Sequence, residues 1–132
     1  MSKIEATIIE TDASLYSVNI ETNGHKLIGD EPESYDSKNL GPAPYDLLLA
    51  ALGECIVMTM RWAAIKYQWP LEKAEVHVTH EKQGREDVFT KKVTLHGASL
   101  TDEQREKLHD IANKCPVHRT LTSGATFRED IT

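Results

Sequence analysis

The segment from residue 45 to residue 67 reads YDLLLAALGECIVMTMRWAAIKY, with no proline and a single glycine. Alanine, leucine and methionine favour helix, so this composition predicts one long helix over residues 45–67. Its apolar residues cover more than one face, which is typical of a helix buried on most sides. Glu54 and Arg61 interrupt the run before the roughly 18 uninterrupted apolar residues of a membrane span. We therefore expect a central core helix and no membrane span.

Short alternations of apolar and polar residues precede this helix. Residues 3–10 and 15–21 have the period-two pattern of strands and are separated by the turn-prone Thr-Asp-Ala-Ser. The dipeptide Asn23-Gly24 predicts a second tight turn, after which residues 25–29 pair back as a third strand. Residues 30–39 are polar and rich in acids, so we expect a loop there.

A second hairpin is predicted after the helix. Residues 74–81 and 88–96 alternate on either side of a turn signal at residues 84–87. The side chains that we expect to face the core from these strands are Val76, Val78, Val93 and Leu95.

Two more helices and a last strand are expected towards the C-terminus. Thr101, followed three positions later by Gln104, is a capping-box pattern that opens a helix to about residue 114. Pro116 stands where a second short helix can begin, and residues 125–131 alternate as a final strand. The inner stripe of the first of these helices is predicted to hold Leu108, Ile111 and Ala112. This order of elements predicts the α+β class.

Length and composition limit the classes of protein that fit. A chain of 132 residues with 39% hydrophobic and 27% charged residues predicts one globular domain over residues 1–132. The formal net charge of −6 opposes binding to phosphate backbones or anionic lipid, so neither nucleic acid nor membrane is an expected partner. Two cysteines and no secretory signal predict a reducing cytoplasm.

The two cysteines, Cys55 and Cys115, are the candidates for chemistry. Cys55 lies in the middle of the apolar helix, where an inert core residue is one interpretation. Cys115 directly precedes the helix-starting Pro116, so it can cap that helix and accept from the amides of Val117 and His118, which favours thiolate. The alternative is a plain capping thiol. If the two thiols meet, one can be oxidised to sulfenic acid and trapped by the other as a disulfide.

Metal binding is a weaker interpretation of the same residues. His77 and His80 are three positions apart on one predicted strand and so point to opposite faces. Cys115 and His118 are only a pair, without the further partners that structural zinc requires. We therefore expect no metal and no cofactor.

Four segments of the chain resemble the OsmC/Ohr family of osmotically inducible and organic hydroperoxide resistance proteins. They are Gly41-Pro-Ala-Pro-Tyr-Asp-Leu-Leu-Leu-Ala-Ala-Leu-Gly-Glu-Cys55, Met58-Thr-Met-Arg61, Trp69-Pro-Leu-Glu72 and Cys115-Pro-Val-His-Arg-Thr-Leu121. The resemblance spans almost the whole chain and is that of an OsmC-like branch. It implies hairpin-rich sheets around a long central helix and two chains intertwined in a homodimer, with the sites near the subunit interface.

The resemblance also implies roles for both cysteines. Cys55 resembles the peroxidatic thiol and Cys115 the resolving thiol of an enzyme that reduces organic hydroperoxides and is re-reduced by a dithiol. Family members activate the first cysteine with an arginine from the N-terminal strands, whereas residues 1–60 of this chain contain no arginine. The candidates for the activating or orienting role are Asp46, Arg61, Arg119, His118 and the lysines.

Two functions are therefore open. The first is a thiol-dependent peroxidase that uses Cys55 and Cys115. The alternative is a small-molecule binding protein that keeps the scaffold and has little or no turnover. In either case the apolar helix over residues 45–67 predicts a homodimer, because one chain of this size cannot cover all its faces.

Overall fold

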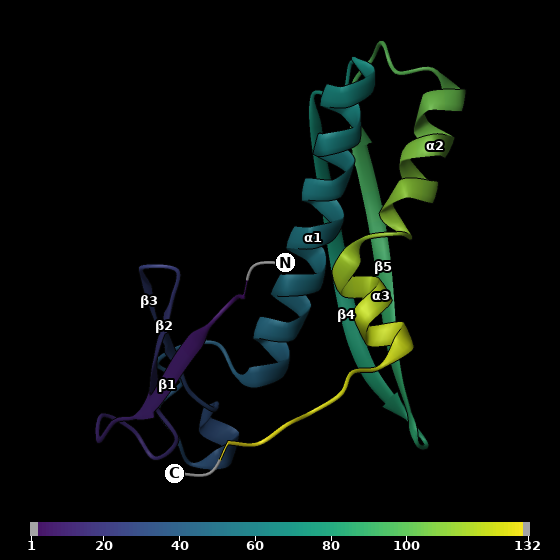
Figure 1. The fold of residues 1–132 in the computed structure, drawn as a ribbon. Coiled ribbons are helices and arrows are strands. Elements are labelled where there is room, and N and C mark those ends of the chain that lie inside the picture. The colour runs from purple at the N-terminus through teal and green to yellow at the C-terminus, as the bar shows by residue number, and fades with distance from the viewer. Residues whose placement is uncertain (1–2, 131–132) are drawn as a thin grey trace. The chain divides into compact units, whose positions relative to one another are not determined.

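The structure, a computed structural model, describes residues 3–130, which form two compact units that divide after Leu48. The long helix α1 (Pro44–Tyr67) begins in the first unit and continues in the second (Figure 1). The α+β class is confirmed, with three α-helices and two antiparallel sheets among the described residues. The prediction of a single domain over residues 1–132 stays a prediction.

The first unit is built on a three-stranded antiparallel sheet of β1 (Ala6–Glu10), β2 (Val18–Thr22) and β3 (His25–Gly29). The predicted turn joins β2 to β3, because Asn23 and Gly24 both have positive φ, 49° and 77°, as a two-residue hairpin turn requires. The first two strands begin three residues later than predicted. Part of the predicted second strand forms a loop instead, in which the Thr11 amide donates to the Ser17 carbonyl.

The acidic loop after β3 is tied to a buried carboxylate. It contains one 3-10 turn, η1 (Glu33–Tyr35), and otherwise has the irregular backbone that was predicted. Asp30 is buried and accepts hydrogen bonds from the Ser37 hydroxyl, the Glu31 amide at 2.8 Å and the Leu40 amide at 3.0 Å. Gly41 follows at a place where a Cβ would lie 2.0 Å from the Ile28 carbonyl oxygen, so only glycine fits.

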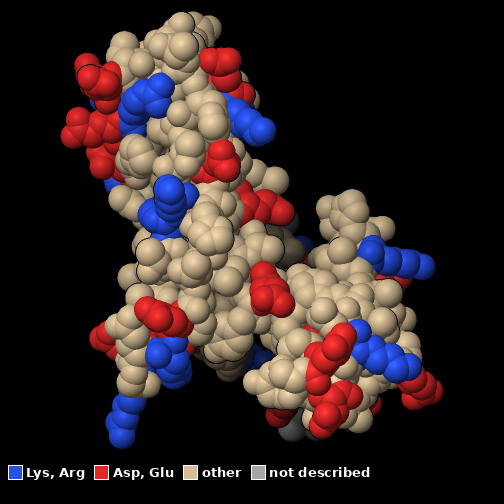
Figure 2. All heavy atoms as spheres, turned by 180° about the vertical axis from the view of Figure 1, so that it is seen from behind, with Lys and Arg blue, Asp and Glu red and all other residues tan. Residues whose placement is uncertain are grey.

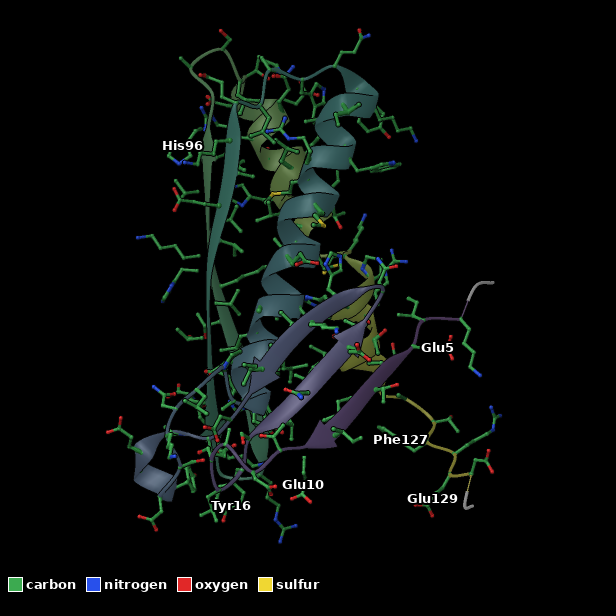
Figure 3. The ribbon with its side chains drawn as sticks, turned by 90° about the vertical axis from the view of Figure 1, so that its left-hand side faces the viewer. Glu5, Glu10, Tyr16, His96, Phe127 and Glu129 are labelled. Atoms are coloured by element: carbon green, nitrogen blue, oxygen red, sulfur yellow. The ribbon has the colours of Figure 1, made fainter. Side chains whose placement is uncertain are left out.

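The second unit consists of a long hairpin and helices that cover one of its faces. Strands β4 (Lys73–Gln83) and β5 (Glu86–His96) pair over their full lengths. Helices α1, α2 (Asp102–Ala112) and α3 (Pro116–Ser123) lie on the same side of this hairpin, and His96 points away from them (Figure 3). The strands are longer than predicted because the turn takes only two residues, 84 and 85.

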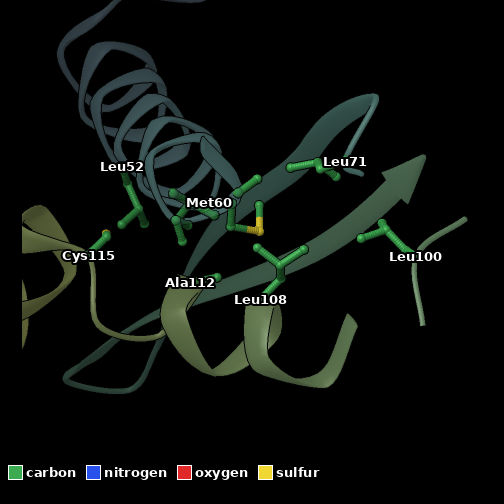
Figure 4. Packing of buried hydrophobic residues seen from close by; sticks show 10 residues of the cluster. Leu52, Met60, Leu71, Leu100, Leu108, Ala112 and Cys115 are labelled. Atoms are coloured by element: carbon green, nitrogen blue, oxygen red, sulfur yellow. The ribbon is translucent and has the colours of Figure 1, made fainter. Parts of the chain in front are cut away.

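The core of this unit lies between α1, α2 and the inner face of the hairpin (Figure 4). The predicted strand residues Val76, Val78, Val93 and Leu95 all pack against it, as do Leu108, Ile111 and Ala112 of the predicted stripe. The predicted capping box is confirmed, because Thr101 accepts from the Gln104 amide and the Gln104 side chain accepts from the Thr101 amide. α1 contributes the row Leu52, Ile56, Met60, Ala63 and Ala64.

The structure differs from the prediction of a helix buried on most sides. Only one stripe of α1 is buried within the chain, and Met58, Trp62 and Ile65 are exposed. By length and composition alone α1 could cross a membrane, and it is the one such helix among residues 3–130. A core helix satisfies the same criterion, and the packed stripe shows that α1 serves as one.

The predicted final strand is wrong. Residues 124–130 have no strand structure, and residue 131 lies outside the described residues. Phe127 is 92% exposed (Figure 3). Alternation of side chains shows which face a residue would take in a sheet, but a strand also needs a neighbour to accept its hydrogen bonds. The described part of the chain provides no such neighbour for this segment.

Charged side chains of both signs lie on the surface. On the face shown in Figure 2, lysines and arginines are interspersed with acidic residues. Two arginines donate hydrogen bonds to backbone carbonyls. The Arg61 guanidinium donates to the carbonyls of Leu71 and Glu72. The Arg105 guanidinium donates to the carbonyls of Leu95 and Gly97.

Candidate active site

Cys55 lies on the hairpin side of α1, midway along the helix. Its side chain is half-buried and packs against the apolar core. One helical turn later, the Thr59 hydroxyl lies 3.9 Å from the Cys55 sulfur, a loose contact. A half-buried thiol in an apolar setting can be reached by a small molecule yet is shielded from bulk water.

Cys115 caps the N-terminus of α3, as the sequence predicts. The His118 amide donates to the Cys115 sulfur at 3.4 Å, and Pro116 occupies the first helical position. The thiol is fully buried, and its side chain points toward α1 (Figure 4). The cap therefore holds the sulfur at a fixed place against the long helix.

The structure brings the two thiols together. The Cys55 and Cys115 side chains come from distant segments of the chain, yet they lie near enough for Cys55 to raise the pKa of Cys115. Both cysteines are free. The pair lies within the second unit, where α1 and the start of α3 meet the core.

Several effects act on the Cys115 charge, and burial is the largest. Burial raises the pKa of Cys115, and the neighbouring Cys55 raises it further. The His118 amide and the Lys91 ammonium lower the pKa of Cys115 but do not offset these effects. The His118 amide thus favours the thiolate as expected, but burial outweighs it and the net pKa of Cys115 is raised, because the sequence did not reveal how completely the thiol is buried.

Lys91 belongs to this site, although the sequence analysis named the lysines only as a group and did not single it out. It is half-buried on β5, opposite Val78 on β4, and donates a hydrogen bond to the Asn113 side chain. The period-two pattern carries the signal, since Lys91 shares its face of the strand with Val93, which was predicted to face the core. A lysine in such a row is a candidate for function.

The other predicted residues have different places. The Asp46 carboxylate accepts from the Ala43 amide at 2.9 Å and so caps the start of α1 in the first unit. The His118 backbone amide donates to the Cys115 sulfur, and the His118 ring is half-buried.

The two candidate arginines lie elsewhere. The Arg119 side chain is exposed, and the cation that acts on Cys115 is Lys91. The guanidinium of Arg61 is held by backbone carbonyls.

Metal-binding clusters are not found in residues 3–130, where no group of three or more His, Cys, Asp or Glu residues is placed to hold an ion. His80 pairs with Asp87 at 2.9 Å and His96 with Glu75 at 2.6 Å, each across the hairpin.

Residues 36–130 match the family described as OsmC-like protein. This match covers most of the chain, including both cysteines and all of α1. The chain belongs to the OsmC-like protein family. The resemblance stated from the cysteine motifs is thereby confirmed.

Solved structures of OsmC-like proteins show the same fold. The OsmC-like protein from Mycoplasma pneumoniae is 18% identical with a TM-score of 0.76, and the match covers 92% of this chain and 88% of that one. An organic hydroperoxide resistance protein OsmC from Legionella pneumophila is 20% identical with a TM-score of 0.63, covering 92% and 90%. A putative organic hydroperoxide resistance protein from Vibrio cholerae, with captopril bound in one of its active sites, is 19% identical with a TM-score of 0.66, covering 92% and 85%. No curated protein matches this sequence.

Proposed function

We propose that this OsmC-like protein is a thiol-dependent peroxidase that reduces organic hydroperoxides through Cys55 and Cys115. The observation that carries the proposal is the meeting of a half-buried thiol and a fully buried one from distant segments of the chain. Two hydroperoxide resistance proteins among the structural relatives support the same substrate class.

Cys55 is the thiol that reacts first, because it is the one that a substrate can reach. Its thiolate attacks the terminal oxygen of the hydroperoxide, the O–O bond breaks, and the alkoxide takes a proton and leaves as the alcohol. Cys55 is then a sulfenic acid. The apolar residues around it favour an alkyl hydroperoxide over hydrogen peroxide, which is better solvated in water.

Cys115 resolves this intermediate. Its thiolate attacks the Cys55 sulfur, the S–S bond forms, and the hydroxide released from the sulfenic acid takes a proton and leaves as water. A dithiol reductant then exchanges with the disulfide and restores both thiols. The raised pKa of Cys115 suits this order, since oxidation of Cys55 to a neutral sulfenic acid removes one of the effects that raise it.

A peroxide assay tests this function. Reduced wild-type protein, supplied with a dithiol, should consume cumene hydroperoxide over many turnovers and hydrogen peroxide much more slowly. Cys55→Ser should fold normally and consume neither, because a hydroxyl is nearly isosteric but cannot form a sulfenic acid. No consumption by the wild type above the dithiol alone would contradict the proposal.

Binding without turnover is the second candidate. It is favoured by two observations: the polar group beside the Cys55 sulfur is the uncharged Thr59 hydroxyl, and residues 1–60 contain no arginine that could activate the thiol. The rate at which iodoacetamide alkylates Cys55 at neutral pH separates the two functions. A rate well above that of a free model thiol supports the peroxidase, whereas a rate at or below it supports binding alone.

We also propose that the working form is a homodimer. Met58, Trp62 and Ile65 are 61%, 57% and 69% exposed and follow one another at helical spacing on the outer side of α1. An apolar stripe of this kind is typical of a subunit interface. Ile65→Asp should shift sedimentation from dimer to monomer or prevent folding, since an unpaired charge would be buried. Leu121→Asp, on α3, is the matched control, and a monomeric wild type would contradict the proposal.

A further inference from the structure

Lys91 occupies a position where the hairpin otherwise presents apolar side chains to the helices. On β5 its neighbours on the same face are Phe89 and Val93, which both pack against the core. Its cross-strand partner is Val78, which packs there too. Charged side chains are rarely placed in such a row unless a partner stabilises them.

The position of the Lys91 ammonium is fixed by the turn that carries Cys115. The ammonium donates to the Asn113 side-chain oxygen. Asn113 is the C-cap of α2: its backbone amide donates to the His109 carbonyl, and the Lys114 amide donates to the Ile111 carbonyl. Cys115 follows two residues later as the N-cap of α3. One turn of chain thus holds both the partner of the cation and the buried thiol.

We propose that Lys91 is a positioning residue that promotes disulfide formation by stabilising the Cys115 thiolate at the moment when it attacks the oxidised Cys55. This inference rests on the proposed peroxidase function and extends it, because it assigns to β5 the cation of the second step. It concerns the second step, at Cys115.

The charged and polar groups that act on Cys115 come from three elements. Burial raises the pKa of Cys115, the His118 amide from α3 lowers it, Cys55 from α1 raises it, and Lys91 from β5 lowers it. The interaction is mutual: burial lowers the pKa of Lys91, and the Cys115 charge raises it. When Cys55 is a neutral sulfenic acid, Lys91 and one amide remain to favour the Cys115 thiolate against burial.

Three variants separate the charge from the structure. Lys91→Met removes the charge and keeps an unbranched side chain in the apolar row. Lys92→Met is the matched control, since Lys92 is the next residue on β5 but is exposed on the opposite face. Lys91→Arg keeps the charge and should restore most of the rate. If Lys91→Met does not fold, Asn113→Ala frees the ammonium from its anchor and should act in the same direction.

The first readout is the pH profile of disulfide formation in a single turnover with cumene hydroperoxide. Lys91→Met should form the Cys55–Cys115 disulfide roughly three- to tenfold more slowly at neutral pH, with the difference shrinking as pH rises. Formation of the Cys55 sulfenic acid should keep its wild-type rate. Equal pH profiles in Lys91→Met and Lys92→Met would overturn the inference.

The second readout needs no peroxide. In a Cys55→Ser background, where Cys115 is the one remaining thiol, its titration is followed by ultraviolet thiolate absorbance. Adding Lys91→Met should raise the pKa of Cys115, and adding Lys92→Met should leave it unchanged. An unchanged Cys115 titration in the Lys91→Met protein overturns the inference. A wild type that forms no disulfide refutes the proposed function instead, while this titration still decides the role of Lys91.

Discussion

Asp30 in the first unit and Cys115 in the second are both acids buried in the fold, and their pKa values move in opposite directions. Burial raises the pKa of each. At Asp30, hydrogen bonds from Ser37 and from the Leu40 and Glu31 amides outweigh burial and lower the pKa to about 2. At Cys115, one amide and one lysine do not. The difference in donors around the two acids thus accounts for a lowered pKa at Asp30 and a raised pKa at Cys115.

The largest effect on peroxide turnover is expected from removing the Cys115 thiol. Cys115→Ser should still oxidise at Cys55, but without a resolving partner the sulfenic acid should persist and take up further oxygen under excess cumene hydroperoxide. Intact mass should show added oxygen in this variant and loss of two hydrogens in the wild type. A Cys115→Ser protein that turns over as fast as the wild type would show that the buried thiol has no role.

A second prediction concerns the core that buries Cys115. Leu108 is fully buried in the same cluster. Leu108→Ala should lower the free energy of unfolding by about 2–5 kcal/mol, because it leaves a cavity. Chemical denaturation measures this, with the more exposed Leu121→Ala as control, which should cost much less. A change below that of the control would mean that this core does not hold the site.

Asp30 makes the stability of the protein depend on pH in the acid range. Because the pKa of Asp30 falls to about 2 from an ordinary 3.8, its contribution to stability is present above pH 3.8 and is lost as pH falls through about 2. Asp30→Asn should therefore unfold more easily than wild type at neutral pH and converge with it near pH 2. Circular dichroism across an acid titration measures this, with exposed Asp12→Asn as control. Acid-unfolding curves of Asp30→Asn and wild type that stay parallel down to pH 2 would show that ionised Asp30 does not stabilise the fold.

The smallest effect is a shift in one titration. Cys55→Ser removes a neighbour that raises the pKa of Cys115, so that pKa should fall relative to wild type. Ultraviolet thiolate absorbance compares the two proteins, the wild type titrating both thiols and the variant one. A higher pKa of Cys115 in the variant would show that Cys55 favours the thiolate, and the proposed order of the two steps would lose its electrostatic support.

The sequence predicted most of the fold because its local signals are strong. The composition of residues 45–67, the Asn23-Gly24 turn and the Thr101 capping box each identify an element without knowledge of the rest of the chain. The final strand over residues 125–131 failed for the opposite reason. A strand depends on a neighbour distant in the chain, and alternation alone does not provide one.

The candidate site was predicted in part. The cap at Cys115 followed from Pro116, a local signal. The sign of its pKa shift did not, since burial depends on how α1 and α2 pack around it. Lys91 was not singled out, although its alternation with Val93 places it on the inner face of the hairpin.

The most direct test of the account is to map the cysteines after one equivalent of cumene hydroperoxide has reacted with the reduced protein. The account predicts one intramolecular disulfide joining the peptides that contain Cys55 and Cys115, loss of two hydrogens from the intact mass, and one molecule of alcohol per chain. Unmodified thiols with intact hydroperoxide, or a disulfide joining Cys55 of one chain to Cys55 of another, would contradict it.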